Sequence, residues 1–275
     1  MTRALKGRAT RALVLARGLG SRMRAGAGDA ALDPAQAAAA DAGHKAMMPF
    51  GSAQGRPFLD HVLHSLADAG VRDVGLVVGP EHTQMREYYG ALETRRVSIA
   101  LVTQELPLGT ADAVASAEAW AGREPFLALN GDNLYPTEAL ARMAAGTTPA
   151  VAGFRRDGLA LADDRVAAFA LIGRAENGRL ARIVEKPGER AVSAAGPGAL
   201  VSMNLWRFDA RIFEACRQAP LSVRGERELP QAVSLALADA MPFDIIDVNG
   251  EVLDLSRRSD VAAVARRLEG AQVDL

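Results

Sequence analysis

Glycines and a cation follow directly after an apolar run near the start of the chain. Residues 12–23, ALVLARGLGSRM, pass from a buried-strand pattern to Gly18, Gly20 and Arg22. Glycine allows backbone N–H groups to approach a phosphate closely, and a guanidinium can bind two phosphate oxygens at once. The alternative is a tight turn with a solvated arginine, and the other motifs of the chain must decide between the two.

A dinucleotide-binding loop is a poor explanation of this stretch. Such a loop requires a third glycine that opens a helix, whereas position 23 is Met23 and no helical pattern begins there. The sequence also contains no GxSxG pattern and no P-loop pattern. We therefore expect a phosphate-binding loop of another class.

Apolar runs alternate with helical patterns through the first half of the chain. We expect strands at 11–16, 73–78, 97–102 and 126–130, and helices at 57–70, 81–89, 110–122 (with Thr110 as its cap) and 136–145. This alternation predicts an α/β fold with a mostly parallel central sheet and helices on both faces. The carboxyl ends of such strands are where open α/β sheets bind ligands.

The second half of the chain is richer in strands. We expect strands at 150–154, 165–172, 179–185 and 199–208, helices near 209–218 and 228–239, strands at 244–248 and 251–255, and a last helix from Ser259. No internal repeat and no long polar linker interrupts this order.

The composition is that of an ordinary globular enzyme. The 275 residues are 49% hydrophobic and 24% charged, and their formal net charge of −1 gives no indication of a nucleic-acid or membrane partner. The single cysteine, Cys216, excludes an intrachain disulfide and fits a reducing compartment. Because no segment resembles a signal peptide or approaches the length of a membrane span, we expect a cytoplasmic protein.

Residues 24–43 form an alanine-rich insertion. Asp33 followed by Pro34 predicts the N-cap and first position of a helix, and Gly43 predicts its end. We expect a short helix that is either a spacer, the interpretation that we favour, or a mobile cap over the glycine loop.

Several further motifs follow the glycine loop in a fixed order. They are a lysine in HKAMMP (44–49), QELPLGTADAV (104–114), LNGDN (129–133), IVEKP (183–187) and EVLDLSRRSDVAAV (251–264). Together with GxGSRM, this series resembles the sugar-1-phosphate nucleotidyltransferases, among them glucose-1-phosphate thymidylyl- and uridylyltransferases. Each motif is weak alone, but the series covers nearly the whole chain. The resemblance implies one Rossmann-like domain over 1–275, with a nucleotide-binding half near 10–148 and a sugar-binding half near 149–275.

The resemblance also implies a reaction and a set of site residues. The reaction joins a sugar-1-phosphate to the α-phosphorus of a nucleoside triphosphate and expels pyrophosphate, so cations and positioning must do most of the work. The implied catalytic residues are Arg22, Lys45 and Lys186. The implied nucleotide-binding residues are Leu15, Ala16, Gly18, Gly20, Ser21, Arg22, Gln104, Gly109 and Thr110. The implied sugar-phosphate-binding residues are Gly153, Glu185, Lys186 and Asn204, and Asp132 and Asp254 would bind Mg²⁺.

Some of these assignments have ordinary alternatives. Lys45 could be a surface lysine, Asp254 could start a turn, and Glu185 with Lys186 could form an exposed ion pair. Arg17 stands where the related motif has a small residue, and it could either help to bind the triphosphate or crowd it.

The base and the acceptor also stay open. The Gln104 carboxamide could accept from the N3–H of uracil or thymine, and the same amide turned over could serve guanine or cytosine. The resemblance favours UTP or dTTP as the donor. A cytidylyl- or guanylyltransferase acting on another phosphorylated acceptor and a non-catalytic nucleotide sensor are the alternatives. The sequence does not indicate which sugar is used or whether the chain forms a homo-oligomer.

Overall fold

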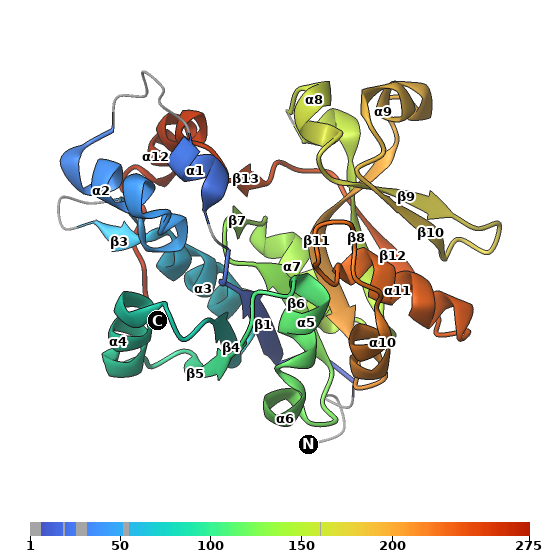
Figure 1. Ribbon diagram of the computed structural model, residues 1–275, viewed down its shortest axis with the longest axis horizontal. Coiled ribbons are helices and arrows are strands. Elements are labelled where there is room, and N and C mark those ends of the chain that lie inside the picture. The colour runs from blue at the N-terminus through green and yellow to red at the C-terminus, as the bar shows by residue number, and fades with distance from the viewer. Residues whose placement is uncertain (1–6, 19, 26–31, 52–54, 160) are drawn as a thin grey trace.

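A mixed nine-stranded sheet forms the centre of the computed structural model, which describes residues 7–18, 20–25, 32–51, 55–159 and 161–275 (Figure 1). Its strands are β1 (Arg11–Leu15), β4 (Asp73–Val78), β5 (Ser98–Thr103), β6 (Phe126–Asn130), β8 (Ala150–Arg155), β9 (Ala170–Arg174), β10 (Leu180–Glu185), β11 (Leu200–Phe208) and β12 (Asp244–Val248). The order is β10-β9-β11-β6-β1-β4-β5, and β8 pairs with β11 and β12.

The helices of the described residues connect these strands. They are α1 (Ser21–Ala25), α2 (Pro34–Ala42), α3 (Phe58–Asp68), α4 (Thr83–Ala91), α5 (Thr110–Ala115), α6 (Glu118–Ala121), α7 (Thr137–Ala145), α8 (Asp163–Val166), α9 (Glu189–Ala195), α10 (Ile212–Gln218), α11 (Leu229–Ala238) and α12 (Val261–Leu268). Short 3₁₀ turns are η1 (Lys45–Met47), η2 (Arg156–Gly158) and η3 (Arg258–Asp260).

Strand alternation divides the core into two layers. In β1, Ala12 and Val14 join the cluster that α3, α7 and α12 cover, whereas Leu13 joins the cluster covered by α5, α10 and α11. The strand must bury both faces because its successive side chains point to opposite sides of the sheet. The strands β1, β4, β5 and β6 are parallel to their neighbours in this group. The predicted fold class is therefore confirmed.

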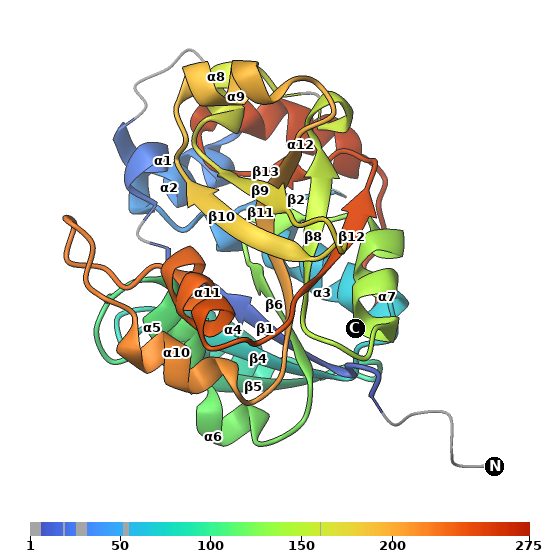
Figure 2. The same ribbon diagram turned by 90° about the vertical axis from the view of Figure 1, so that its right-hand side faces the viewer.

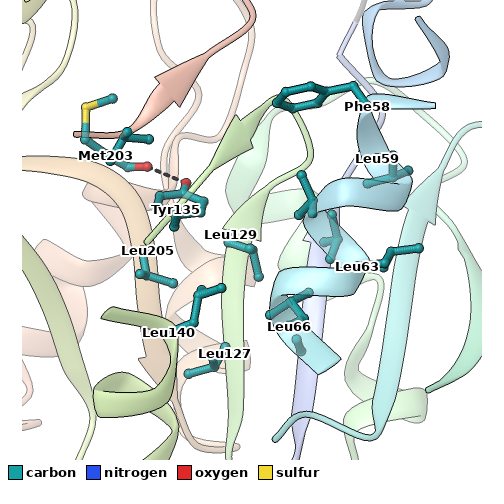
Figure 3. Close-up of a cluster of buried hydrophobic side chains, with 14 of the residues drawn as sticks. Phe58, Leu59, Leu63, Leu66, Leu127, Leu129, Tyr135, Leu140, Met203 and Leu205 are labelled. Carbon is teal, nitrogen blue, oxygen red and sulfur yellow. Dashed lines mark hydrogen bonds between the residues drawn. The ribbon is translucent and has the colours of Figure 1, made fainter. Parts of the chain in front are cut away.

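The layer around α3 illustrates how the apolar pattern positions the binding edge of the sheet (Figure 3). One face of α3 packs its leucines against Leu127 and Leu129 of β6, and all of these side chains are buried. At the upper end of the same layer the Tyr135 hydroxyl donates to the Met203 carbonyl at 2.6 Å. This bond fixes the turn after β6 to the middle of β11.

The second half of the chain extends the same sheet. Strand β11 runs antiparallel to β6, β8 and β9, and β12 runs parallel to β8. Figure 2 shows α8 and α9 together at one end of β9 and β10. A small ladder then returns the chain to the first half, because β13 (Leu253–Asp254) pairs with β7 (Asn133–Leu134). A second small ladder joins β2 (Pro49–Phe50) to β3 (Arg56–Pro57).

The helix predicted in the alanine-rich insertion is confirmed. Asp33 caps α2 in a capping box with Gln36, Pro34 is its first residue, and Gly43 ends it in the left-handed conformation. The Gln36 side chain donates to the Pro49 carbonyl at 3.2 Å, and Ala40 is fully buried. These contacts favour the spacer interpretation for the described part of the insertion; residues 26–31 lie outside the described residues.

Two sequence expectations are wrong in detail. The strand expected at 165–172 begins only at Ala170, because α8 occupies the preceding residues and the Arg165 side chain is engaged with two aspartates. The helix expected at 110–122 is split into α5 and α6, and Thr110 does not cap it. Its hydroxyl accepts instead from the Leu229 N–H at 2.9 Å.

Candidate active site

A cavity of about 410 Å³ lies at the carboxyl ends of β1 and β6 and extends toward β10 and β11. Most residues expected from the sequence line it. These are Leu15, Ala16, Gly18, Ser21, Arg22, Lys45, Gln104, Gly109, Thr110, Asp132, Glu185, Lys186, Asn204 and Asp254. The topology explains this gathering, because parallel strand ends meet at one edge of the sheet.

Gly20 and Gly153 are the exceptions. Gly153 lies within β8, where a Cβ would stand 3.0 Å from Ile245 and 3.2 Å from Leu200. Gly153 therefore leaves room for aliphatic packing. It does not line the cavity, although the resemblance implied that it binds the sugar phosphate.

Gly20 fixes the path of the chain rather than lining the cavity. Its φ is +60°, and a Cβ there would stand 2.2 Å from the carbonyl oxygen of Gly43. The loop therefore needs glycine at this position because the end of α2 crosses it.

We predict that Gly20→Ala destabilises the fold by about 1–3 kcal/mol, since both the positive φ and the contact with Gly43 disfavour a side chain. Urea unfolding measures this. Gly18→Ala is the matched control, because a Cβ there meets only the Lys45 side chain at 3.5 Å. Equal unfolding midpoints for the two variants would contradict the proposed crossing of Gly20 and Gly43.

The Arg22 guanidinium is exposed at the mouth of the cavity. Arg22 lies on the five-residue helix α1, whose buried residue is its neighbour Met23. None of the described residues accepts a hydrogen bond from Arg22. A cation with no partner among the described residues, beside a loop of backbone N–H groups, is suited to bind a phosphate.

Two carboxylates stand behind this loop. The ladder between β7 and β13 pairs Asp254 with Asn133, and the Leu255 N–H donates to the Asp132 carbonyl at 2.9 Å. The sequence expectation that these two aspartates meet is thus consistent with the geometry. Burial, and next the negative charge of Asp132, raises the pKa of the Asp254 carboxyl above its ordinary value.

Each of these carboxylates has a cationic partner. Asp132 accepts from the Lys45 ammonium. Asp254 accepts from Arg165 at 2.5 Å, and Arg165 also bonds Asp260 at 2.8 Å. Lys45 and Arg165 therefore neutralise the two carboxylates in this structure, and carboxylates are the oxygen ligands that Mg²⁺ prefers. Among the described residues, no group of three or more His, Cys, Asp or Glu side chains could hold a metal.

A chain of side-chain amides connects this site to β11. The Asn133 amide donates to Asp254 at 3.1 Å, and Asn130 donates to Asn133 at 3.1 Å. Asn204 in turn donates to Asn130 at 3.3 Å and accepts from the Trp206 indole at 2.9 Å. Asn204 has a positive φ of 62°, which departs from the strand and brings its side chain into the cavity lining.

Gln104 is buried, and its amide orientation is defined. Its side-chain N–H groups donate to the Gly109 carbonyl at 3.1 Å and to the Asp112 carboxylate at 2.8 Å. Because a carboxylate only accepts, the amide cannot be turned over without losing this bond. The part of Gln104 that remains for a ligand is therefore its side-chain oxygen Oε1, which is a hydrogen-bond acceptor.

The loop that follows Gln104 is held by the second half of the chain. Gly109 has a φ of +99°, and a Cβ there would stand 2.5 Å from the Arg227 carbonyl oxygen. The Ala111 N–H donates to the same carbonyl at 2.9 Å. This close approach of two backbones requires glycine.

Lys186 follows β10 in an uncommon backbone conformation. Its φ is +45°, which costs a non-glycine residue about 1 kcal/mol or more. Its ammonium lies 3.9 Å from Glu185 and 3.8 Å from Glu228. Burial, and next the charge of Glu228, raises the pKa of the Glu185 carboxyl. Lys186 and Glu185 thus form part of a charged cluster and not a simple exposed pair.

Several residues of the cavity lining were not expected from the sequence. They are His44, His82, Arg224, Glu226 and Glu228. Arg17, which the sequence placed near the triphosphate, also lines the cavity. Arg224 bonds Glu228 at 2.5 Å and adds a second cation near Lys186. Its segment, 222–228, is polar like an ordinary solvated loop, so composition gave no signal; only its contact with the loop after Gln104 brings it to the cavity.

None of the helices in the described part of the chain is long and apolar enough to cross a membrane.

Comparison with known proteins agrees with this geometry. Residues 40–253 match the model of a family described as nucleotidyl transferase. The chain is 25% identical over 225 residues to the low-salt glycan biosynthesis nucleotidyltransferase Agl11 of Haloferax volcanii, covering 80% of this chain and 58% of that protein. It is 26% identical to the UTP–glucose-1-phosphate uridylyltransferase AglF of the same organism, covering 78% of this chain and 85% of that protein.

Solved structures show the same fold. A crystal structure of UDP-glucose pyrophosphorylase complexed with UDP-glucose matches with a TM-score of 0.72 at 18% identity. The match covers 94% of this chain and 98% of that one.

Proposed function

The chain belongs to the nucleotidyl transferase family, and we propose that it transfers a uridylyl or thymidylyl group from UTP or dTTP to a sugar-1-phosphate, giving a nucleoside-diphosphate sugar and pyrophosphate. The observation that carries the proposal is the charge arrangement of one cavity. Arg22 and Lys45 line it beside the glycine loop, where Lys45 bonds Asp132, and Lys186 and Arg224 line it together with their shared partner Glu228. Two polyanions can meet there only if cations offset the charge of both.

The acceptor oxygen of Gln104 supports the choice of base. Uracil and thymine present an N3–H donor, whereas cytosine presents a lone pair at the same ring position. A group that can only accept pairs with the first two and opposes the third. Guanine also presents a ring N–H, but it is the larger base, and a relative named for UTP supports the pyrimidine.

The proposed reaction needs no general base. The sugar-phosphate oxygen is already an anion, and it attacks the α-phosphorus while the bond from that phosphorus to the bridging oxygen of the β-phosphate breaks. The electron pair leaves with pyrophosphate, where Arg22 and Lys45 would receive the developing charge. Lys186 would orient the incoming phosphate. Asp132 and Asp254 would hold Mg²⁺, which would supply charge neutralisation at the phosphate oxygens.

The test is a pyrophosphate-release screen of UTP, dTTP, CTP, GTP and ATP against a panel of sugar-1-phosphates and alcohol phosphates. We expect release with UTP or dTTP and at least one sugar-1-phosphate. Release only with CTP or GTP and an alcohol phosphate would replace the proposal with the alternative transferase. Nucleotide binding without release from any pair would favour a nucleotide sensor.

A further inference from the structure

Arg17 is the first residue after the Ala16 that ends the apolar run, and it precedes Gly18 in the glycine loop. Its long side chain does not extend toward solvent, since only 7% of it is exposed. Its Nε and Nη2 groups donate to the two carboxylate oxygens of Glu81 at 2.9 and 3.0 Å. Its Nη1 group donates to the backbone carbonyl of Gln104.

The space for this arrangement is provided by Gly79. A Cβ at Gly79 would stand 2.4 Å from the Nε of Arg17 and 2.3 Å from both carboxylate oxygens of Glu81. The ion pair therefore fits against the end of β4 only because the residue there has no side chain. This match between an unusual cation and an adjacent glycine indicates a built contact and not a chance orientation.

The contact completes the restraint of Gln104. The Gln104 N–H donates to the Val78 carbonyl at 3.0 Å, and its side-chain N–H groups bond Gly109 and Asp112. Arg17 holds the backbone carbonyl. Every polar group of Gln104 apart from its side-chain oxygen thus has a protein partner, and Arg17 is the partner that comes from the glycine loop.

We propose that Arg17 is a positioning residue that sets the Gln104 acceptor for an N3–H-bearing pyrimidine, and that it is not a ligand of the triphosphate. The inference rests on the proposed function, because it assigns the base-reading part of that site. Its physical reason is that three guanidinium donors are already used and that Glu81 neutralises the charge. Fixing Gln104 from two loops lowers the cost of ordering the acceptor when the base binds.

This proposal makes a distinction that can be measured. A residue that positions the base reader affects uridine mono-, di- and triphosphate equally, since all three carry the same base. A residue that binds phosphate affects the triphosphate most. The N3–H group provides a second test, because 3-methyluridine nucleotides lack it and cannot donate to Gln104.

The experiment measures binding of UMP, UDP, UTP and 3-methyl-UMP by calorimetry to the wild type and to Arg17→Met, a neutral side chain of similar length. We expect about a 10-fold loss for each uridine nucleotide, as for one weakened buried hydrogen bond. We also expect the ratio of the two binding affinities, UMP over 3-methyl-UMP, to be smaller in Arg17→Met than in the wild type. Arg17→Lys should recover part of that preference, because its ammonium can donate to the Gln104 carbonyl but cannot also bind Glu81 in a two-pronged way.

Two further variants separate positioning from folding. Arg86→Met is the matched control, because Arg86 donates at 3.1 Å to the side chain of Thr103, the neighbour of Gln104, and does not line the cavity. It should leave all four affinities unchanged. Glu81→Gln keeps Arg17 but weakens its anchor at a half-exposed position, so it should narrow the UMP preference by a smaller factor.

The outcomes divide clearly between the two proposals. A loss in Arg17→Met that grows from UMP to UTP, or an unchanged preference for UMP over 3-methyl-UMP, would overturn the role of Arg17. A wild type that binds none of the three unmethylated uridine nucleotides, and no dTTP in a parallel titration, would instead overturn the proposed function itself.

Discussion

Asp132→Asn should lower turnover by at least about 10³-fold while the protein stays folded, since metal ions at phosphoryl centres are worth several kcal/mol of transition-state stabilisation. The substitution keeps the shape of the side chain and removes its charge. The backbone bond from Leu255 to the Asp132 carbonyl stays intact. What is lost is one of two adjacent carboxylates, which we propose to be the Mg²⁺ ligands together with Asp254.

Three measurements test this prediction. Pyrophosphate release is followed with Mg²⁺ and with a chelator, and calorimetry follows Mg²⁺ binding to the nucleotide-loaded protein, where Asp132→Asn should weaken it. Circular dichroism checks the fold. Asp157→Asn is the matched control, because Asp157 is an exposed aspartate that pairs with Arg155 outside the cavity. Full activity of the wild type in chelator would refute the metal assignment.

The parts of the site that follow strand ends could be predicted from the sequence. Apolar runs that end in glycine, such as those before Gly18 and Gly131, predict where parallel strands stop, and polar residues just beyond them must share one edge of the sheet. Asp132 follows such a strand end, which supported the assignment that the family resemblance implied. Gln104 was implied by the resemblance of residues 104–114 alone. The fold class followed from the same alternation of strand and helix patterns.

Contacts between distant segments could not be predicted in this way. Arg17 meets Glu81 and Gln104, which lie 64 and 87 residues away, and no local periodicity reports such a pairing. Gly153 is a second case in which the contact comes from a distant segment. Glycine in a strand marks a close approach, but the approach at β8 is by Ile245 from β12, which only the sheet register reveals.

The failure at 165–172 has a related cause. Alternating small and apolar residues in that segment satisfy a strand pattern, yet Arg165 gains two carboxylate partners when its residues form α8. Tertiary ion pairs decided the conformation where intrinsic propensity was weak. The pair between Arg165 and Asp254 also ties α8 to a residue of the cavity lining.

Arg22→Ala should reduce kcat by about 10³-fold and change the affinity for substrate far less. Arginines that stabilise phosphoryl transfer contribute on that order, because their contact is strongest when charge collects on the leaving group. Arg22 is suited to this role since it lines the cavity beside the glycine loop and has no partner among the described residues. Arg17 cannot substitute for it, because its guanidinium is held by Glu81 and Gln104. Arg22→Lys should restore only part of the rate, as a lysine lacks the two-pronged contact.

Steady-state kinetics with the best substrate pair separates the two possible roles of Arg22. The matched control is Arg24→Ala, which removes an exposed arginine from the same helix α1 at a position outside the cavity lining and should leave both parameters near wild type. If Arg22→Ala raises KM while kcat stays normal, the interaction is equally strong in the ground state and Arg22 only holds the nucleotide. Lys45, which lines the same cavity and bonds Asp132 in this structure, would then be the next candidate for the cation that contacts the leaving group.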